Sequence, residues 1–389
     1  MRNPLSQKVV GIQPSGIRKF FDVVNEMKDA ISLGVGEPDF DTPWRIREEG
    51  IYTLEKGRTF YTSNAGRKEL KIEICKYLDR KVNVQYDYNH EVIVTVGGSE
   101  GIDIALRAML DPGDEVLIPQ PSYVSYLPCT ILADGVPVVI PLQHKNEFKL
   151  TAEELEAAIT PKTKILVMPF PNNPTGSIMT KEDLEPIVEL VKKHDLFVIS
   201  DEIYSELSYK GEHVSIASFE GMKERTILIN GFSKGYAMTG WRLGYACGPA
   251  NIIEQMVKIH QFAIMCAPTN SQYAAVEALR NCDEEVKEMR ESYNQRRRFL
   301  VHEFKRMKLE FFETFGAFYI FPNIKEFGMT SEEFATRLLE EEKVAVVPGT
   351  AFGDCGEGFL RISYAYSLED LKEAIGRLGR FIDRLRNER

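Results

Sequence analysis

Short apolar segments alternate with longer amphipathic segments between about residues 90 and 250. The short segments are rich in β-branched residues, and most are apolar on both faces, which is typical of strands buried inside a sheet. They are Val92–Val96, Glu115–Ile118, Lys164–Met168, Leu196–Ile199, Thr226–Ile229 and Leu243–Cys247. This alternation predicts an α/β fold, in which helices flank a mostly parallel central sheet.

The pattern changes after about residue 283. A charged helical segment is expected over Glu284–Met307, strands near Phe318, Val344 and Leu360, and a closing helix over Leu368–Arg386. This order predicts a smaller α+β domain. We therefore expect a large domain of residues 46–283 and a small domain formed by residues 1–45 together with 284–389. Turn signals in the first 45 residues suggest that this segment lies over a cleft and is no domain of its own.

Composition and charge exclude several classes of function. The 389 residues suit two to three domains, and 43% hydrophobic with 27% charged residues is typical of a globular protein. A net charge of −10 provides no field that would attract nucleic acid or anionic lipid, so we expect neither as a partner. No apolar run approaches the roughly 20 residues that cross a bilayer, and the start lacks the apolar segment of a secretory signal.

The six cysteines are scattered without a C-x-x-C pair, which predicts reduced thiols in a cytoplasmic protein. The histidines stand apart from one another, without an H-E-x-x-H arrangement. The sequence therefore predicts no metal site.

A glycine-rich turn follows the first predicted strand. Its sequence is GGSEG at residues 97–101, and it opens a segment with apolar residues at helical spacing. Unpaired N–H groups at the start of that helix, near Gly98 and Ser99, would bind a phosphate dianion. The alternative is an ordinary strand-to-helix turn in which Ser99 is the N-cap.

Polar residues also follow later strands. Asp201 comes directly after Leu196–Ile199, Tyr204 lies one helical turn further, and Asn173 belongs to a PNNPTG turn after the preceding strand. The carboxyl ends of parallel strands form the edge of the sheet at which ligands bind. The alternatives are an acidic helix start and a plain Asn-Pro turn.

Lys234 follows the strand Thr226–Ile229 in the sequence Gly-Phe-Ser-Lys, and Arg242 lies eight residues beyond it. Burial in an apolar core would lower the pKa of this lysine and leave a nucleophilic free amine. The alternatives are a surface lysine with a buried stem and an arginine paired with a helix end.

Two nucleotide motifs are excluded. The glycines at 235 and 240 have the spacing of a phosphate loop, but Trp-Arg replaces the required Lys-Ser/Thr, and no G-x-G-x-x-G follows a strand.

Phosphate donors, a carboxylate, a phenol and a lysine together predict pyridoxal 5'-phosphate. Asp201 would hold the pyridine nitrogen protonated, and Tyr204 would hydrogen-bond the ring oxygen together with Asn173.

Several motifs in order along the chain carry a family resemblance. They are LGVGEPDFDTP at 33–43, PNNPTG at 171–176, SKGYAMTGWR at 233–242, VVPG at 346–349 and FLRISY at 359–364. With them the chain resembles the class I/II aminotransferases, pyridoxal-phosphate enzymes of fold type I, and within them the aspartate/aromatic subgroup. The resemblance implies a homodimer with shared active sites.

The resemblance also implies roles. Lys234 is similar to the lysine that binds the cofactor aldehyde covalently and then moves a proton as general base. Arg361 resembles the arginine that grips the substrate α-carboxylate, assisted by Asn173 and the backbone of Gly36. Tyr123 is similar to the aromatic residue that stacks on the pyridine ring. In this pattern Asp201 and Tyr204 keep the roles already given.

Further residues are implied around the phosphate. Arg242 with Gly98, Ser99 and Ser233 would hold it, and Tyr61 resembles the tyrosine that reaches the cofactor phosphate of the neighbouring subunit. One position departs from the pattern, because many relatives have a hydroxyl three residues before the lysine and this chain has Gly231.

We therefore expect a ping-pong aminotransferase that moves an amino group from an L-amino acid to a 2-oxo acid such as 2-oxoglutarate. Some aspartate-acting relatives carry a lysine just inside the glycine-opened helix, where this chain has Ser99-Glu100, so aromatic or broad donors are favoured. The alternatives are an aspartate aminotransferase and a β-lyase on the same scaffold. A non-catalytic regulatory module is the third, and the full set of cofactor positions disfavours it.

Overall fold

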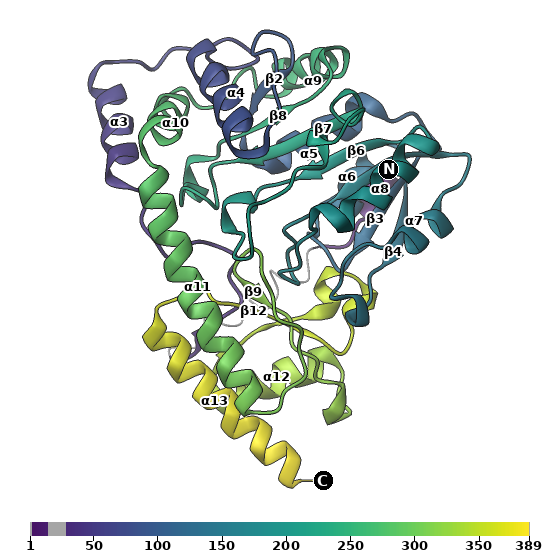
Figure 1. Cartoon of the computed structure of the whole chain (residues 1–389), viewed down its shortest axis with the longest axis vertical. Coiled ribbons are helices and arrows are strands. Elements are labelled where there is room, and N and C mark those ends of the chain that lie inside the picture. The colour runs from purple at the N-terminus through teal and green to yellow at the C-terminus, as the bar shows by residue number, and fades with distance from the viewer. Residues whose placement is uncertain (1, 15–28, 389) are drawn as a thin grey trace.

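The computed structural model describes residues 2–14 and 29–388, and a seven-stranded sheet forms the centre of its larger part (Figure 1). The strand order is β2-β8-β7-β6-β5-β3-β4. The strands are β2 Val92–Thr95, β3 Glu115–Gln120, β4 Val136–Pro141, β5 Thr163–Met168, β6 Phe197–Asp201, β7 Thr226–Gly231 and β8 Gly244–Cys247. Strand β8 runs antiparallel to the other six strands, which are parallel to one another, so the predicted mostly parallel sheet is confirmed.

Strand β4 is the one strand of this sheet that the hydrophobic pattern did not predict. It lies at the edge of the sheet, and its Val136 and Val139 are 44% and 40% exposed. Proline occupies its second and last positions. Edge strands tolerate proline because part of their backbone has no ladder partner. The segment therefore lacks the continuous apolar pattern that identified the buried strands.

Helices cover both faces of the sheet. On one face α5 Gly97–Met109, α6 Tyr126–Leu132 and α9 Ala250–Ala263 pack against side chains such as Val116 and Ile199. On the other face α7 Ala152–Ala158 and α8 Lys181–Lys193 pack against Leu117 and Val198. Adjacent strand residues thus point to opposite faces. At the β2 end, α10 Thr269–Asn281 packs against both α3 Trp44–Glu55 and α4 Lys68–Val82.

The smaller part lies at the far end of the long helix α11 Asp283–Arg306 (Figure 1). It contains the antiparallel sheet β11-β12-β9 and two helices, and a short N-terminal strand pairs with β10. The elements are β1 Ile31–Ser32, β9 Tyr319–Ile320, β10 Val344–Ala345, β11 Val347–Pro348, β12 Leu360–Ser363, α12 Ser331–Glu342 and α13 Leu368–Asn387. A further short helix, α1 Gln7–Val10, lies near α6.

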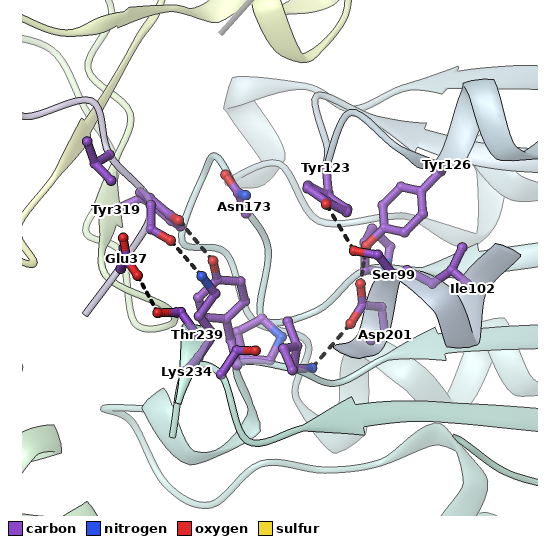
Figure 2. A pocket seen from close by; sticks show the side chains of 18 of the residues that line it. Glu37, Ser99, Ile102, Tyr123, Tyr126, Asn173, Asp201, Lys234, Thr239 and Tyr319 are labelled. Carbon is purple, nitrogen blue, oxygen red and sulfur yellow. Dashed lines mark hydrogen bonds between the residues drawn. The ribbon is translucent and has the colours of Figure 1, made fainter. Parts of the chain in front are cut away.

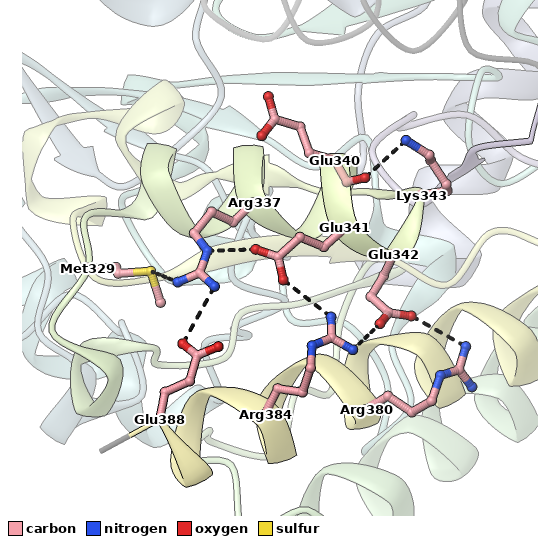
Figure 3. A network of polar contacts seen from close by, with 9 residues as sticks. All are labelled: Met329, Arg337, Glu340, Glu341, Glu342, Lys343, Arg380, Arg384 and Glu388. Carbon is pink, nitrogen blue, oxygen red and sulfur yellow. Dashed lines mark hydrogen bonds and ion pairs between the residues drawn. The ribbon is translucent and has the colours of Figure 1, made fainter.

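Ion pairs join α12 to α13 (Figure 3). Glu342 of α12 accepts from Arg384 at 2.5 Å and from Arg380 at 3.3 Å, both on α13. Glu341 pairs with Arg384 and also with Arg337 of its own helix. The Glu342 side chain is only 9% exposed, so its two cations compensate its lost hydration. The network fixes how α13 lies against the rest of the smaller part.

The division into domains at 46–283 stays a prediction, and α11 supports it because this helix begins at Asp283 and leads from one part to the other. The predicted segment 1–45 includes residues 1 and 15–28, which lie outside the described residues. Its strand β1 pairs with β10 of the smaller part. Within the described ranges, no helix is long and apolar enough to span a bilayer.

Candidate active site

A cavity of about 410 Å³ lies where the two parts meet, and Figure 2 shows its lining. The large sheet contributes residues that follow its strands: Gly98 after β2, Asn173 after β5, Asp201 at the end of β6 and Lys234 after β7. The small sheet contributes Tyr319 from β9 and Arg361 from β12. The cavity therefore lies at the ligand-binding edge expected for an open α/β sheet.

The structure brings together every predicted site residue except one. The cavity is lined by Gly36, Gly98, Ser99, Tyr123, Asn173, Asp201, Tyr204, Ser233, Lys234, Arg242 and Arg361. Tyr61 is not among them: it lies in the loop after α3, with 81% of its surface exposed beside an equally exposed Phe60. Within one chain Tyr61 is therefore exposed to solvent and does not line this cavity.

The Lys234 amine points into the cavity. Its Nζ donates a hydrogen bond of 2.6 Å to the carbonyl oxygen of Gly36. Desolvation lowers the pKa of Lys234 from 10.5 to about 8; the carboxylate of Glu37 opposes this, whereas the guanidinium of Arg361 adds to it. Near neutral pH a usable fraction of the amine is therefore unprotonated and nucleophilic.

Asp201 is a buried carboxyl at the carboxyl end of β6. It accepts a 2.6 Å hydrogen bond from the hydroxyl of Tyr126 and a 3.2 Å bond from the N–H of Ile203. Burial raises the pKa of Asp201, although both hydrogen bonds act in the opposite direction. A cationic N–H of a ligand would restore the ionised form, so this side chain suits a protonated ring nitrogen.

Helix α5 begins at Gly97 without a side-chain cap. The hydroxyl of Ser99 instead lies 3.2 Å from the hydroxyl of Tyr123, so Ser99 is not the N-cap that the alternative interpretation required. Among the described residues, no side chain accepts from the N–H groups of Gly97, Gly98 or Ser99, so the start of the helix suits an anion.

Arg242 lies beside this helix start. Gly97 has φ of 77°, and a Cβ at this position would lie 2.8 Å from Nη2 of Arg242. Glycine therefore allows the guanidinium to approach the backbone closely. Arg242 is fixed by a 2.9 Å hydrogen bond from Nη1 to the carbonyl oxygen of Thr239. A phosphate dianion fits between this cation and the uncapped helix.

The departure at Gly231 has a steric cause. A Cβ at residue 231 would lie 2.9 Å from the Cα of Gly244 and 3.0 Å from the carbonyl oxygen of Leu243. The close approach of β7 and β8 thus leaves little room for a side chain. The phosphate site would depend on Ser233, Arg242 and the helix N–H groups.

The guanidinium of Arg361 lies between two aromatic rings, 4.5 Å from the ring centre of Tyr319 and 4.7 Å from that of Phe352. Its Nη1 donates to Oδ1 of Asn173 at 2.8 Å, and its Nη2 donates to the carbonyl oxygen of Gly34. Its buried Nε has no hydrogen-bond partner among the described residues. Leaving such a donor unpaired is costly, so a carboxylate entering the cavity would be stabilised here.

The sequence interpretation missed four polar lining residues: Glu37, Tyr126, Thr239 and Tyr319. Tyr126 had a usable signal, because it lies three residues after Tyr123 at the start of α6, and the two rings meet edge to face. No sequence signal pointed to Tyr319, because its neighbour Tyr204 is 115 residues away in the sequence.

Comparisons with known proteins agree with this geometry. The model of the family "Aminotransferase class I and II" matches residues 28–378. A putative aminotransferase, YugH, of Bacillus subtilis is 51% identical over 98% of this chain and 99% of its own length. An aspartate aminotransferase of Pyrococcus abyssi is 49% identical over 96% and 97%. The solved aromatic aminotransferase of Pyrococcus horikoshii superposes with a TM-score of 0.90, at 46% identity over 94% and 99% of the two chains.

Proposed function

The chain belongs to the class I and II aminotransferases, with the fold of the type I pyridoxal-phosphate enzymes, and from this premise we propose that it binds pyridoxal 5'-phosphate at Lys234. As an aminotransferase it would take the amino group of an L-amino acid, with aromatic or broad specificity, and deliver it to a 2-oxo acid such as 2-oxoglutarate. The observation that carries the proposal is the Lys234 amine, with a pKa of about 8, in one cavity with a buried carboxylate and an uncapped helix start.

The residues present fit each part of that cofactor. The phosphate would be held by Gly98, Ser99, Ser233 and Arg242, and Asp201 would keep the ring nitrogen protonated. Tyr204 and Asn173 would hydrogen-bond the ring oxygen, and Tyr123 would stack on the ring. When bound, the cofactor supplies an electron sink for the bond electrons of the substrate α-carbon.

The remaining steps are performed by protein side chains. Arg361 would bind the substrate α-carboxylate through its guanidinium, with Asn173 and the backbone of Gly36 completing the contact. This orients the α-carbon towards Lys234. Once the substrate amine has replaced it on the cofactor aldehyde, the free amine of Lys234 would remove the α-proton and deliver it to C4' of the cofactor, acting first as general base and then as general acid.

Charge in the cavity supports aromatic or broad donors. The cations among the described lining residues are Lys234, Arg242 and Arg361, and each already has a role. The lining also includes the carboxylate of Glu37, which bonds the hydroxyl of Thr239. The distal carboxylate of aspartate would therefore find no uncommitted cation among these described lining residues.

Aspartate aminotransferase activity is the second candidate, and the aspartate-acting relative from Pyrococcus abyssi favours it. A screen of the twenty amino acids with 2-oxoglutarate decides between the two. 2-Oxoglutarate has a distal carboxylate and pyruvate has none. A preference for 2-oxoglutarate as acceptor would therefore indicate that a cation outside these lining residues binds the distal carboxylate. Release of pyruvate and ammonia without an oxo-acid acceptor would instead indicate a β-lyase.

A homodimer with shared active sites belongs to the proposal. The loop that carries the strongly exposed Phe60 and Tyr61 lines a surface pocket with the start of α10, and Phe262 on α9 is 88% exposed. Such aromatic exposure is typical of a subunit interface. Tyr61 would then reach the cofactor phosphate of the partner subunit. We also propose a cytoplasmic location, which the six free cysteines support.

The decisive experiment examines Lys234. Purified protein should be yellow, and borohydride should fix a pyridoxyl group on this lysine, as peptide mass spectrometry can show. Lys234→Ala should still take up the cofactor but lose transamination by several orders of magnitude, because it removes both nucleophile and base. The matched control is Lys258→Ala, an exposed lysine on α9 that should leave activity unchanged. Colourless wild-type protein without a label on Lys234 would overturn the proposal.

A further inference from the structure

Tyr319 contacts three of the residues to which the proposed reaction assigns a role. Its hydroxyl lies 2.8 Å from the hydroxyl of Tyr204, and its ring lies under the guanidinium of Arg361 at 4.5 Å. A Cβ on Gly36 would lie 2.4 Å from the same hydroxyl, so Gly36 leaves space for it. One buried side chain thus touches the cofactor-side phenol and the substrate-side guanidinium.

The position of Tyr319 in the fold explains why this contact matters. Tyr319 is on β9 and pairs with Ser363 of β12, the strand that carries Arg361. Tyr204 lies on the other side of the cavity, just after β6 of the large sheet. The hydroxyl pair therefore joins β9 to the segment after β6 across the cavity, and Figure 2 labels Tyr319 among the lining side chains. A purely apolar packing residue at 319 would leave the Tyr204 hydroxyl without this partner.

The direction of the hydrogen bond decides what Tyr204 can do. Either hydroxyl can donate in this pair. If the oxygen of Tyr204 accepts the O–H of Tyr319, the O–H of Tyr204 is free to turn towards a ligand. The cation above the Tyr319 ring makes its O–H a stronger donor, because positive charge stabilises the electron-rich phenol oxygen.

We propose that Tyr319 is a positioning residue for the aminotransferase reaction: its hydroxyl directs the O–H of Tyr204 towards the cofactor ring oxygen, and its ring holds the guanidinium of Arg361 in place for the substrate carboxylate. The inference rests on the proposed function, because it concerns the same cavity. Tyr319 makes two separate contributions, because its hydroxyl acts through Tyr204 and its ring acts through Arg361.

Two substitutions separate these contributions. Tyr319→Phe keeps the ring under Arg361 and removes only the hydroxyl. We expect the pH midpoint of the bound cofactor's absorbance to rise by about 0.5 to 1 unit, the size of one weakened hydrogen bond. We also expect kcat to fall about 5- to 10-fold and the amino-acid KM to stay within about twofold. Tyr319→Leu also removes the ring, so here KM should rise about tenfold.

A double-mutant cycle tests the route through Tyr204. Tyr204→Phe should shift the midpoint by itself, and Tyr319→Phe should add no further shift in that background, because the group through which it acts is gone. Tyr364→Phe is the matched control: this buried tyrosine of the smaller part donates to the carbonyl oxygen of Ala317 and is not a lining residue of the cavity. It should leave both the midpoint and kcat unchanged.

The outcomes distinguish this inference from the proposed function. If wild-type protein takes up the cofactor on Lys234 while Tyr319→Phe matches Tyr364→Phe in midpoint and kcat, Tyr319 has no positioning role. Additive midpoint shifts in the cycle would equally overturn the route through Tyr204. If the wild-type protein takes up no cofactor, the proposed function itself fails.

Discussion

Replacing Arg361 by lysine tests how the site would recognise its substrate. Arg361 is 2% exposed, its guanidinium is held by Asn173 and Gly34, and its buried Nε–H has no acceptor in the part of the chain that the structure describes. Lysine retains the positive charge and places it on a flexible stem. It cannot reproduce a planar fork that binds both carboxylate oxygens while lying between two rings.

The expected magnitude follows from these contacts. One charge-assisted hydrogen bond to the carboxylate is lost, which is worth about 1.5 to 3 kcal/mol. That corresponds to an increase of about 10- to 150-fold in the amino-acid KM. Because the carboxylate contact is made in the ground state as well as in the transition state, kcat should change much less than KM. Loss of stacking on Tyr319 and Phe352 would add to the effect.

The assay is steady-state transamination with varied amino acid at saturating oxo acid, together with thermal unfolding. Arg297→Lys is the control, because Arg297 is also a buried arginine stacked on an aromatic ring, 5.0 Å from Phe315, but is not a lining residue of the cavity. It should lower the unfolding temperature without raising KM. An unchanged KM in correctly folded Arg361→Lys would remove Arg361 from substrate binding.

Two further predictions concern cofactor uptake by protein from which the cofactor has been removed. Because burial holds the pKa of Lys234 at about 8, the free-amine fraction rises as pH increases through 8. The rate of covalent uptake should therefore increase about fivefold from pH 7 to 8 and level off near pH 9, whereas a lysine with a pKa of 10.5 would give a rate still rising tenfold per unit at pH 9. Gly97→Ala would place a methyl group 2.8 Å from Nη2 of Arg242 at φ of 77° and should weaken cofactor affinity by at least about tenfold. Equilibrium titration of the absorbance measures this, with Gly113→Ala, also at positive φ but with nothing near its Cβ, as the control for backbone strain alone. Equal affinities of the two variants would show that Arg242 does not hold the phosphate.

The hydrophobic pattern was sufficient for most of the architecture. Buried parallel strands have to be apolar on both faces, so β2, β3, β5, β6, β7 and β8 were predicted close to their observed bounds. In the large sheet only the edge strand β4, with exposed valines and two prolines, was not predicted. The same logic placed Asn173, Asp201 and Lys234 together, because residues that follow parallel strands share one edge of the sheet.

The tertiary structure alone decided the contacts between segments that are distant in sequence. Tyr126 meets Asp201 across 75 residues, Tyr319 meets Tyr204 across 115, and Arg361 meets Asn173 across 188. The sequence pattern around Arg361 shows only a charged residue on a short strand. Its expected role in binding the substrate α-carboxylate came from the family resemblance. Sequence periodicity reports which face of an element is buried, because that depends on near neighbours. Which side chain from another element lies opposite depends on how whole layers pack, and no local pattern in the sequence encodes it.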